Sequence, residues 1–113
     1  MLVRPWDRDK DYSTLVKWWE QWEFGVVPKE CLPPEGVMVE SDGHPLCAGG
    51  LYVGEGTKFG FMEWIVTDRH ADSRKIHTGL KLCIDSIMDL AKDKGIKLVY
   101  TATKDHLPHN HIK

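Results

Sequence analysis

The chain has 113 residues, which is enough for one domain spanning 1–113 and too few for two. Its formal net charge of −2 argues against a broad nucleic-acid-binding surface, because neutralising phosphates requires clustered lysines and arginines. With 42% hydrophobic and 28% charged residues, the composition is that of a folded protein rather than a disordered one. No apolar run approaches the roughly 20 residues that span a bilayer, so we expect no membrane segment.

The cysteines Cys31, Cys47 and Cys83 are odd in number and widely spaced, with no CxxC pair. This pattern predicts neither a zinc knuckle nor a disulfide framework, and it favours reduced thiols in a cytoplasmic protein. Three histidines lie close to the end of the sequence: His106, His109 and His111. No second ligand group accompanies them, so we expect exposed histidines rather than a metal site.

The first part of the chain predicts a strand over 2–6 and then a helix, which the polar residues 7–11 can cap. One apolar face of this helix is expected from the spacing of Tyr12, Leu15, Val16, Trp19 and Trp22. The group Trp18, Trp19 and Trp22 is expected to be mostly core, and Trp18, which falls off this face, is the candidate for an exposed tryptophan at a contact surface. Three prolines within 26–34 leave room for at most one helical turn there.

Three strands follow. Residues 36–41 and 45–54 flank Asp42-Gly43, a strong hairpin signal, and Gly49-Gly50 suggests a bulge or a close backbone approach. The strand 59–67 is apolar on both faces and belongs at the centre of a covered sheet. Simple alternation puts one set of its apolar residues on one face and a second set on the other. The first set is Phe59, Phe61 and Ile65, and the second is Met62, Trp64 and Val66.

A polar loop over 67–73 precedes the best helix of the sequence, 74–94, which Gly95 ends. A final strand is predicted over 96–103. A helical connection of this length places the strands on either side of it parallel. The fold class is therefore α+β, with helices and a mixed sheet in layers.

This order of elements resembles the GCN5-related N-acetyltransferase (GNAT) superfamily from its first strand to its fifth. The family carries Arg or Gln, two residues, Gly, one residue, then Gly or Ala at the helix after its fourth strand. Arg74 and Gly79 match that pattern, and His77 stands in place of the first glycine. The family normally continues through a further helix and two more strands, so the resemblance implies a fold truncated after the fifth strand, or a fragment.

The resemblance implies acetyl-CoA as the cofactor. Unpaired amides and a partial positive charge at a helix start attract phosphate oxygens, and cations there oppose the helix dipole unless an anion is present. The expected phosphate-binding residues are Arg74, Lys75, His77, Thr78 and Gly79. By analogy with the family, main-chain atoms of Trp64, Ile65 and Val66 would pair with the pantetheine arm.

Glu63 is the candidate general base, because alternation puts it beside Phe61 and Ile65, where apolar surroundings would raise its pKa. The alternative is a carboxylate paired with an arginine or one at a sheet margin. Tyr100 is the candidate proton donor, and its alternative role is packing within the sheet.

Two functions remain open at this stage. The first is an acetyl-CoA-dependent N-acetyltransferase acting on an amine that the sequence does not identify. The second is a non-catalytic GNAT-fold binding or virion-associated module, since the stretches LPPEG, DGHPLCAGGLY and MEWIVTD resemble small GNAT-like proteins of tailed phages. In that case the protein would lie in the host cytoplasm or the virion. An open edge on the fifth strand, at Leu98–Tyr100, predicts a homodimer or another partner covering it.

Overall fold

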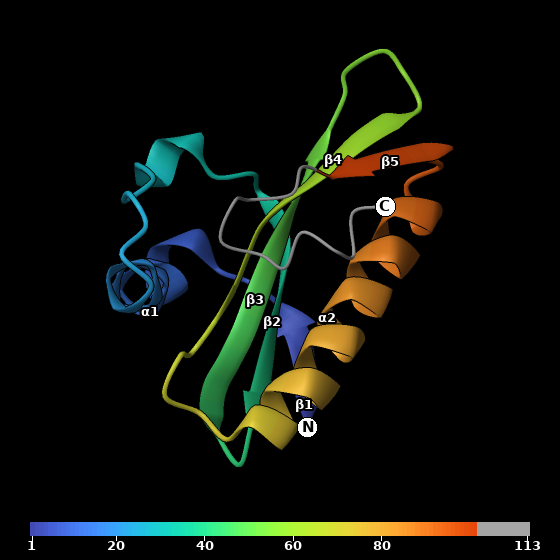
Figure 1. The fold of residues 1–113 in the computed structure, drawn as a ribbon. Coiled ribbons are helices and arrows are strands. Elements are labelled where there is room, and N and C mark those ends of the chain that lie inside the picture. The colour runs from blue at the N-terminus through green and yellow to red at the C-terminus, as the bar shows by residue number, and fades with distance from the viewer. Residues whose placement is uncertain (102–113) are drawn as a thin grey trace, which may run out of the picture.

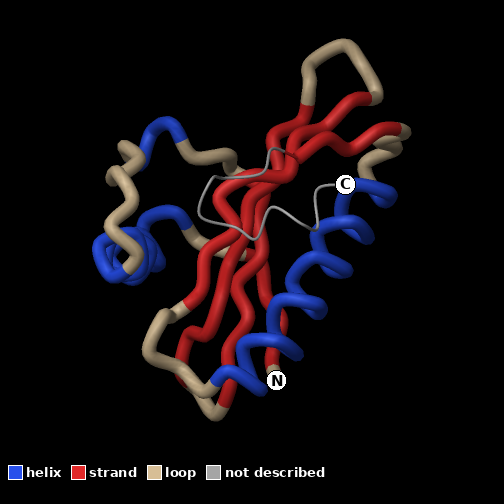
Figure 2. The backbone as a smooth tube through the Cα atoms, viewed as in Figure 1, coloured by secondary structure: helices blue, strands red, loops and turns tan. Residues whose placement is uncertain are grey.

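The computed structural model describes residues 1–101, which form a five-stranded sheet with one α-helix on each face (Figures 1 and 2). The elements are β1 (Leu2–Pro5), α1 (Arg8–Gln21), the short 3-10 helix η1 (Lys29–Cys31), β2 (Glu35–Ser41), β3 (His44–Val53), β4 (Phe59–Thr67), α2 (Ser73–Asp93) and β5 (Leu98–Thr101). The α+β class and the order of elements expected from the sequence are confirmed. Neither α1 nor α2 is both long and apolar enough to cross a membrane, and the same holds for every helix within 1–101.

The strands lie in the order β1-β2-β3-β4-β5, and neighbours are antiparallel up to β4. β5 then pairs with β4 in the parallel direction, from Phe59 with Leu98 to Met62 with Thr101. The predicted parallel pairing across the α2 connection is therefore confirmed. Within the described residues, β5 pairs with β4 only up to Met62, so the stretch 63–67 of β4 extends beyond it.

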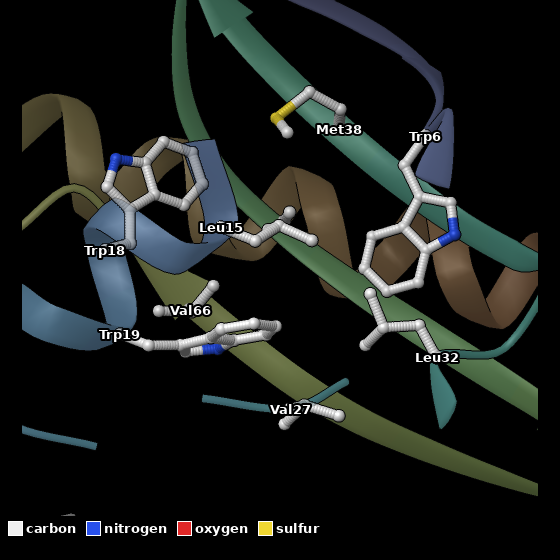
Figure 3. Packing of buried hydrophobic residues seen from close by; sticks show 9 residues of the cluster. Trp6, Leu15, Trp18, Trp19, Val27, Leu32, Met38 and Val66 are labelled. Carbon is white, nitrogen blue, oxygen red and sulfur yellow. The ribbon is translucent and has the colours of Figure 1, made fainter. Parts of the chain in front are cut away.

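The α1 side of the sheet is built around tryptophans (Figure 3). Asp7 caps α1, as expected, by accepting hydrogen bonds from two backbone N–H groups of the first turn. Trp18 is only 2% exposed, so the expectation of an exposed contact surface there is wrong. The spacing of the apolar residues predicted that α1 is buried on one face only. In the structure, both the sheet and the segment 24–34 contribute to the buried cluster around α1, so Trp18 is buried as well. Its buried members are Trp6, Leu15, Trp18, Trp19, Val27, Leu32, Met38, Ala48 and Val66.

The hairpin of β2 and β3 forms as predicted, with positive φ angles of 54° at Asp42 and 80° at Gly43. Close backbone approach, also predicted for this region, is confirmed at Gly50. A Cβ on Gly50 would lie 2.6 Å from the Trp6 ring, so the indole packs directly on the β3 backbone.

A β-bulge in β4 changes the expected faces of that strand. Ala48 pairs with Val66 and Gly50 with Glu63, so Trp64 and Ile65 together stand opposite Gly49. Trp64 adopts a φ of 62°, which costs a non-glycine residue about 1–2 kcal/mol and must be imposed by its surroundings.

The extra residue shifts the alternation of side chains along the strand. Ile65 and Met62 therefore pack on the α2 side, whereas Trp64 and Val66 pack on the α1 side. The sequence-based placing of Ile65 with Phe61, and of Met62 with Val66, is wrong for this reason.

Candidate functional site: a pocket at the end of β4

A pocket of about 410 Å³ lies where β4 ends, between the end of α1 and the start of α2. Most of its surface is apolar, with a polar margin from the loop that follows β4. Its lining residues are Trp22, Phe24, Ile65, Val66, Thr67, Asp68, Arg69, Ala71, Ser73, Ile76 and Leu80.

The pocket runs along the edge of β4 rather than over one face of the sheet. Ile65 packs with the α2-side cluster and Val66 with the α1-side cluster, yet both line the pocket. Within residues 1–101, β5 pairs with this side of β4, and the last pair joins Met62 of β4 to Thr101 of β5. The pocket therefore occupies the edge of β4 that lies beyond its pairing with β5.

Contacts between α1 and the loop after β4 hold one wall of the pocket in place. The Trp22 indole Nε1 donates a 2.9 Å hydrogen bond to the carbonyl of Thr67. The Arg69 guanidinium donates a 2.8 Å bond to the carbonyl of Gln21 and lies 5.0 Å from the Trp22 ring centroid. Trp22 in turn stacks on Phe24, with ring centroids 6.2 Å apart. The aromatic wall is therefore fixed by hydrogen bonds, and Arg69 places a positive charge beside it.

The opposite wall is the beginning of α2. The Ile76 N–H bonds to the Asp72 carbonyl, so the preceding amides at Ser73, Arg74 and Lys75 are those without an intrahelical acceptor. Ser73 lines the pocket, while the Arg74 and Lys75 side chains are exposed beside it. Three free amides and the Arg74 side chain favour an anion at this end of the pocket. Lys75 pairs with Asp42 at 3.3 Å, and Asp68 adds a carboxylate to the lining.

The later residues of the predicted phosphate motif lie elsewhere on α2. His77 and Thr78 are exposed and do not line the pocket, and their amides lie inside the helix. Gly79 is buried on the side of α2 that faces the sheet, where an added Cβ would lie 2.6 Å from Leu46 Cδ2 and 3.4 Å from Cys47 Sγ. Packing alone therefore explains a glycine at position 79, because the missing side chain lets α2 lie close to β3.

Solved structures with a similar arrangement include proteins in complex with CoA and an acetyltransferase. One is a Mycobacterium tuberculosis protein in complex with CoA, with a TM-score of 0.73 and 16% identity over 93% of this chain and 66% of that one. Another is the Neisseria gonorrhoeae N-acetylglutamate synthase complexed with CoA and L-arginine, with a TM-score of 0.72 and 14% identity over 97% of this chain and 30% of that one. A third is a ribosomal-protein-alanine N-acetyltransferase from Brucella melitensis, with a TM-score of 0.70 and 16% identity over 97% of this chain and 85% of that one.

The chain has the GNAT fold. No protein-family model and no curated protein matches the sequence. The assignment of the fold therefore rests on the comparison of structures. The chain spans 66% of the mycobacterial protein and 30% of the gonococcal synthase, and both of those were crystallised with CoA.

The two catalytic candidates lie on the α1-side face of this GNAT sheet. Glu63 pairs with Gly50, whose Cβ direction points to Trp6, and Tyr100 pairs with Phe61 on the same face. Glu63 is half-buried, and within residues 1–101 its carboxylate has neither a hydrogen bond nor an ion pair. The expected alternative, a carboxylate paired with an arginine, therefore does not hold among the described residues. Tyr100 is 57% exposed and packs its ring against Phe61.

Sequence reasoning missed more than half of the pocket lining. Trp22 and Phe24 follow α1 far from β4 in the chain, so only the folded arrangement brings them together. Arg69 could be recognised only weakly as a site residue from the sequence, by its charge and its position in the polar loop that follows the strand 59–67. Ile76 and Leu80 lie in the helix predicted over 74–94, and both line the pocket near the start of α2.

Metal binding finds no support in the part of the chain that is described. No group of three or more His, Cys, Asp or Glu side chains within 1–101 is arranged to hold an ion. The histidines His106, His109 and His111 lie outside the described residues.

Proposed function

We propose that the protein binds acetyl-CoA in the pocket at the end of β4 and transfers the acetyl group to an amine. The observation that carries this proposal is the position of the pocket, which joins the extended edge of β4 to the free amides of α2. A thioester on a long pantetheine arm that leads to a diphosphate needs an apolar channel followed by an anion site, and the pocket supplies them in that order.

The residues present fit such a cofactor. Its pantetheine arm would lie along the backbone of Trp64, Ile65 and Val66, whose edge extends beyond the pairing with β5. Its diphosphate would meet the amides of Ser73–Lys75, with the Arg74 and Lys75 side chains adding charge. Bound there, acetyl-CoA supplies an activated thioester carbonyl.

Glu63 and Tyr100 supply the proposed proton transfers. Glu63 takes a proton from the incoming ammonium group, so that the amine nitrogen can form the new C–N bond. The C–S bond would break as the C–N bond forms, and the departing CoA sulfur would receive a proton from the Tyr100 hydroxyl. The acylated nitrogen would then lose its second proton to the Tyr100 oxygen, and Glu63 would release its proton to solvent. A carboxylate without a partner among the described residues suits the first role, because no cation there competes for it.

Thermal unfolding with and without acetyl-CoA tests the binding step. At 100 times its dissociation constant, a ligand adds about 2.7 kcal/mol to the free energy of unfolding. Lys75→Ala should weaken the shift, whereas Lys81→Ala should leave it unchanged. The two variants are matched, because each removes an exposed ion pair of α2, with Asp42 at 3.3 Å and with Asp85 at 3.4 Å. No shift at any acetyl-CoA concentration would contradict the proposal.

The second candidate function is a non-catalytic GNAT-fold module, in the cell or in a virion. Two observations favour it: His77 occupies the place of a motif glycine, and Gly79 is accounted for by packing. A protein that binds acetyl-CoA yet transfers no acetyl group to any of a broad panel of amines would support this candidate.

The proposed partner on the β5 edge applies to either function. Among the described residues β5 pairs only with β4, and Leu98 and Tyr100 are 59% and 57% exposed. A second copy of the chain pairing along that edge would satisfy the open backbone groups of β5. Light scattering tests this, and a monomer at every concentration would contradict it.

A further inference from the structure

Three aromatic rings lie together on the α1-side face of β4 and β5, and we call Phe59, Phe61 and Tyr100 the aromatic surface. Phe61 and Tyr100 meet edge to face with centroids 5.4 Å apart, and Phe59 and Phe61 do so at 5.9 Å. Tyr100 also lies 6.2 Å from Phe59, so each ring contacts the other two. Such mutual contacts keep the rings in fixed orientations.

Neither core of the protein accounts for this group. Within residues 1–101, the α1-side cluster includes Trp64 and Val66 of β4 but none of the three rings, and the α2-side cluster includes none of them either. Tyr100 is 57% exposed, and the two phenylalanines are half-buried. An ordered set of partly exposed rings beside a proposed active site is typical of a binding surface.

Glu63 lies next to the aromatic surface. It follows Phe61 by two positions on the same face, before the bulge, and its carboxylate is without a partner among the described residues. Beyond it, the Trp64 indole donates to the Tyr52 hydroxyl at 2.7 Å, and that hydroxyl donates to the Cys31 carbonyl at 2.6 Å. These bonds form a fixed border on the side of β3 and η1.

The chemistry of this surface selects a cation with an apolar body. Aromatic faces attract ammonium groups through their quadrupole, and the Glu63 carboxylate adds a full negative charge. An acidic amine, such as an amino acid, would meet repulsion from that charge. A polyamine would gain the Glu63 carboxylate for one ammonium group only, and its further charges would have just the weaker attraction of the ring faces.

We infer that the amine acceptor is a small arylalkylamine or a similarly apolar primary amine, held by the aromatic surface with its ammonium group at Glu63. This inference rests on the proposed function, because it names the substrate of the same site. The ammonium nitrogen would lose one proton to Glu63 and form a C–N bond to the acetyl carbon as the C–S bond breaks. Its second proton would replace the one that the CoA sulfur takes from Tyr100.

Two measurements test this inference. The first is binding of 2-phenylethylamine, spermidine and glutamate to the protein without cofactor, followed by NMR. We expect 2-phenylethylamine to bind at least about tenfold more tightly than the other two. Glu63→Gln and Tyr100→Leu should each weaken its binding, whereas Glu20→Gln, an exposed carboxylate on α1, should not.

The second measurement is CoA release with each amine in the presence of acetyl-CoA. The inference predicts the highest kcat/KM for 2-phenylethylamine and a raised amine KM in Tyr100→Leu, with an unchanged thermal shift by acetyl-CoA. Equal binding of the three amines, or unaltered binding in both variants, would overturn the inference even if acetyl-CoA binds. The absence of an acetyl-CoA shift would instead overturn the proposed function, and the cofactor-free binding data would still decide on the surface.

Discussion

The indole Nε1 of Trp64 donates a 2.7 Å hydrogen bond to the hydroxyl of Tyr52 on the neighbouring strand. That hydroxyl donates in turn to the carbonyl of Cys31 at 2.6 Å, so a short chain of bonds links the bulge of β4 to β3 and η1. The bulge residue has a φ of 62°, and these contacts contribute to holding it there.

Tyr52→Phe should lower the free energy of unfolding by about 1–2 kcal/mol, because it removes one hydrogen-bond acceptor and one donor. It should also weaken acetyl-CoA binding, since the backbone around Trp64 is the proposed contact for the pantetheine arm. Thermal unfolding measures the first effect and titration calorimetry the second.

Tyr12→Phe is the matched control for Tyr52. Its hydroxyl donates a 2.8 Å bond to the Val27 carbonyl, away from the bulge. This variant should lose some stability and keep its acetyl-CoA affinity. Equal losses of affinity in the two variants would show that the bulge has no particular role in binding.

Gly79→Ala separates two explanations for a glycine in the motif. A Cβ there would lie 2.6 Å from Leu46 Cδ2 in a buried contact, so we expect a loss of about 1–3 kcal/mol from overpacking. Thr78→Ala, at the exposed neighbouring position, should change stability by less than about 0.5 kcal/mol. Chemical denaturation of both variants measures these values.

The double variant Gly79→Ala with Leu46→Ala gives a further check. Removing the Leu46 side chain makes room for the new methyl group, so the combined loss should be smaller than the sum of the single losses. A Gly79→Ala variant of native stability that no longer binds acetyl-CoA would point instead to close contact with a phosphate.

The order and type of the elements were predictable because each depends on local signals. Asp7 caps α1, Asp42-Gly43 makes the hairpin, and the continuous apolar run of β4 places it inside the sheet. The parallel pairing of β4 and β5 followed from the length of the helical connection alone.

The bulge was not predictable at its true position, and it changed the site. Gly49-Gly50 suggested an irregularity in β3, but the extra residue is Trp64 on the opposite strand, in a φ region that tryptophan rarely adopts. Period-two alternation cannot register such an insertion, so residues before and after it were assigned to shared faces that they do not share. The aromatic wall of the pocket, Trp22 and Phe24, depends on tertiary contacts that no local pattern encodes.

The thiols should differ sharply in reactivity. Cys31 is exposed, whereas Cys47 and Cys83 are buried. A hydrogen bond with Cys47 and burial both raise the pKa of the Cys83 thiol, which keeps it protonated at neutral pH. Ellman's reagent should therefore modify one thiol rapidly in the native protein and the other two only on unfolding. Rapid modification of all three would contradict the buried arrangement.

The ion pair between Arg4 and Asp11 should make stability depend on pH. Arg4 donates to both oxygens of the 3%-exposed Asp11, at 2.8 and 2.9 Å, and it also contacts Glu40 at 2.9 Å. Burial alone would raise the pKa of Asp11, but the bonds from Arg4 and from the Asp7 N–H outweigh it and lower that pKa. A lowered pKa means that the stabilisation is fully present above about pH 4, the value of an unfolded aspartate, and declines below it.

Asp11→Asn should therefore cost about 1.5–3 kcal/mol at pH 7, because it removes a charged partner of Arg4 in a buried setting. The difference from the wild type should shrink as the pH falls below about 4, since the wild-type carboxyl then becomes neutral as well. Asp89→Asn, an exposed position on α2, should show no such pH-dependent difference. Urea denaturation across this pH range measures both. If the free energies of unfolding of the wild type and Asp11→Asn differed by the same amount at every pH, packing of the side chain, rather than its charge, would join α1 to β1 and β2.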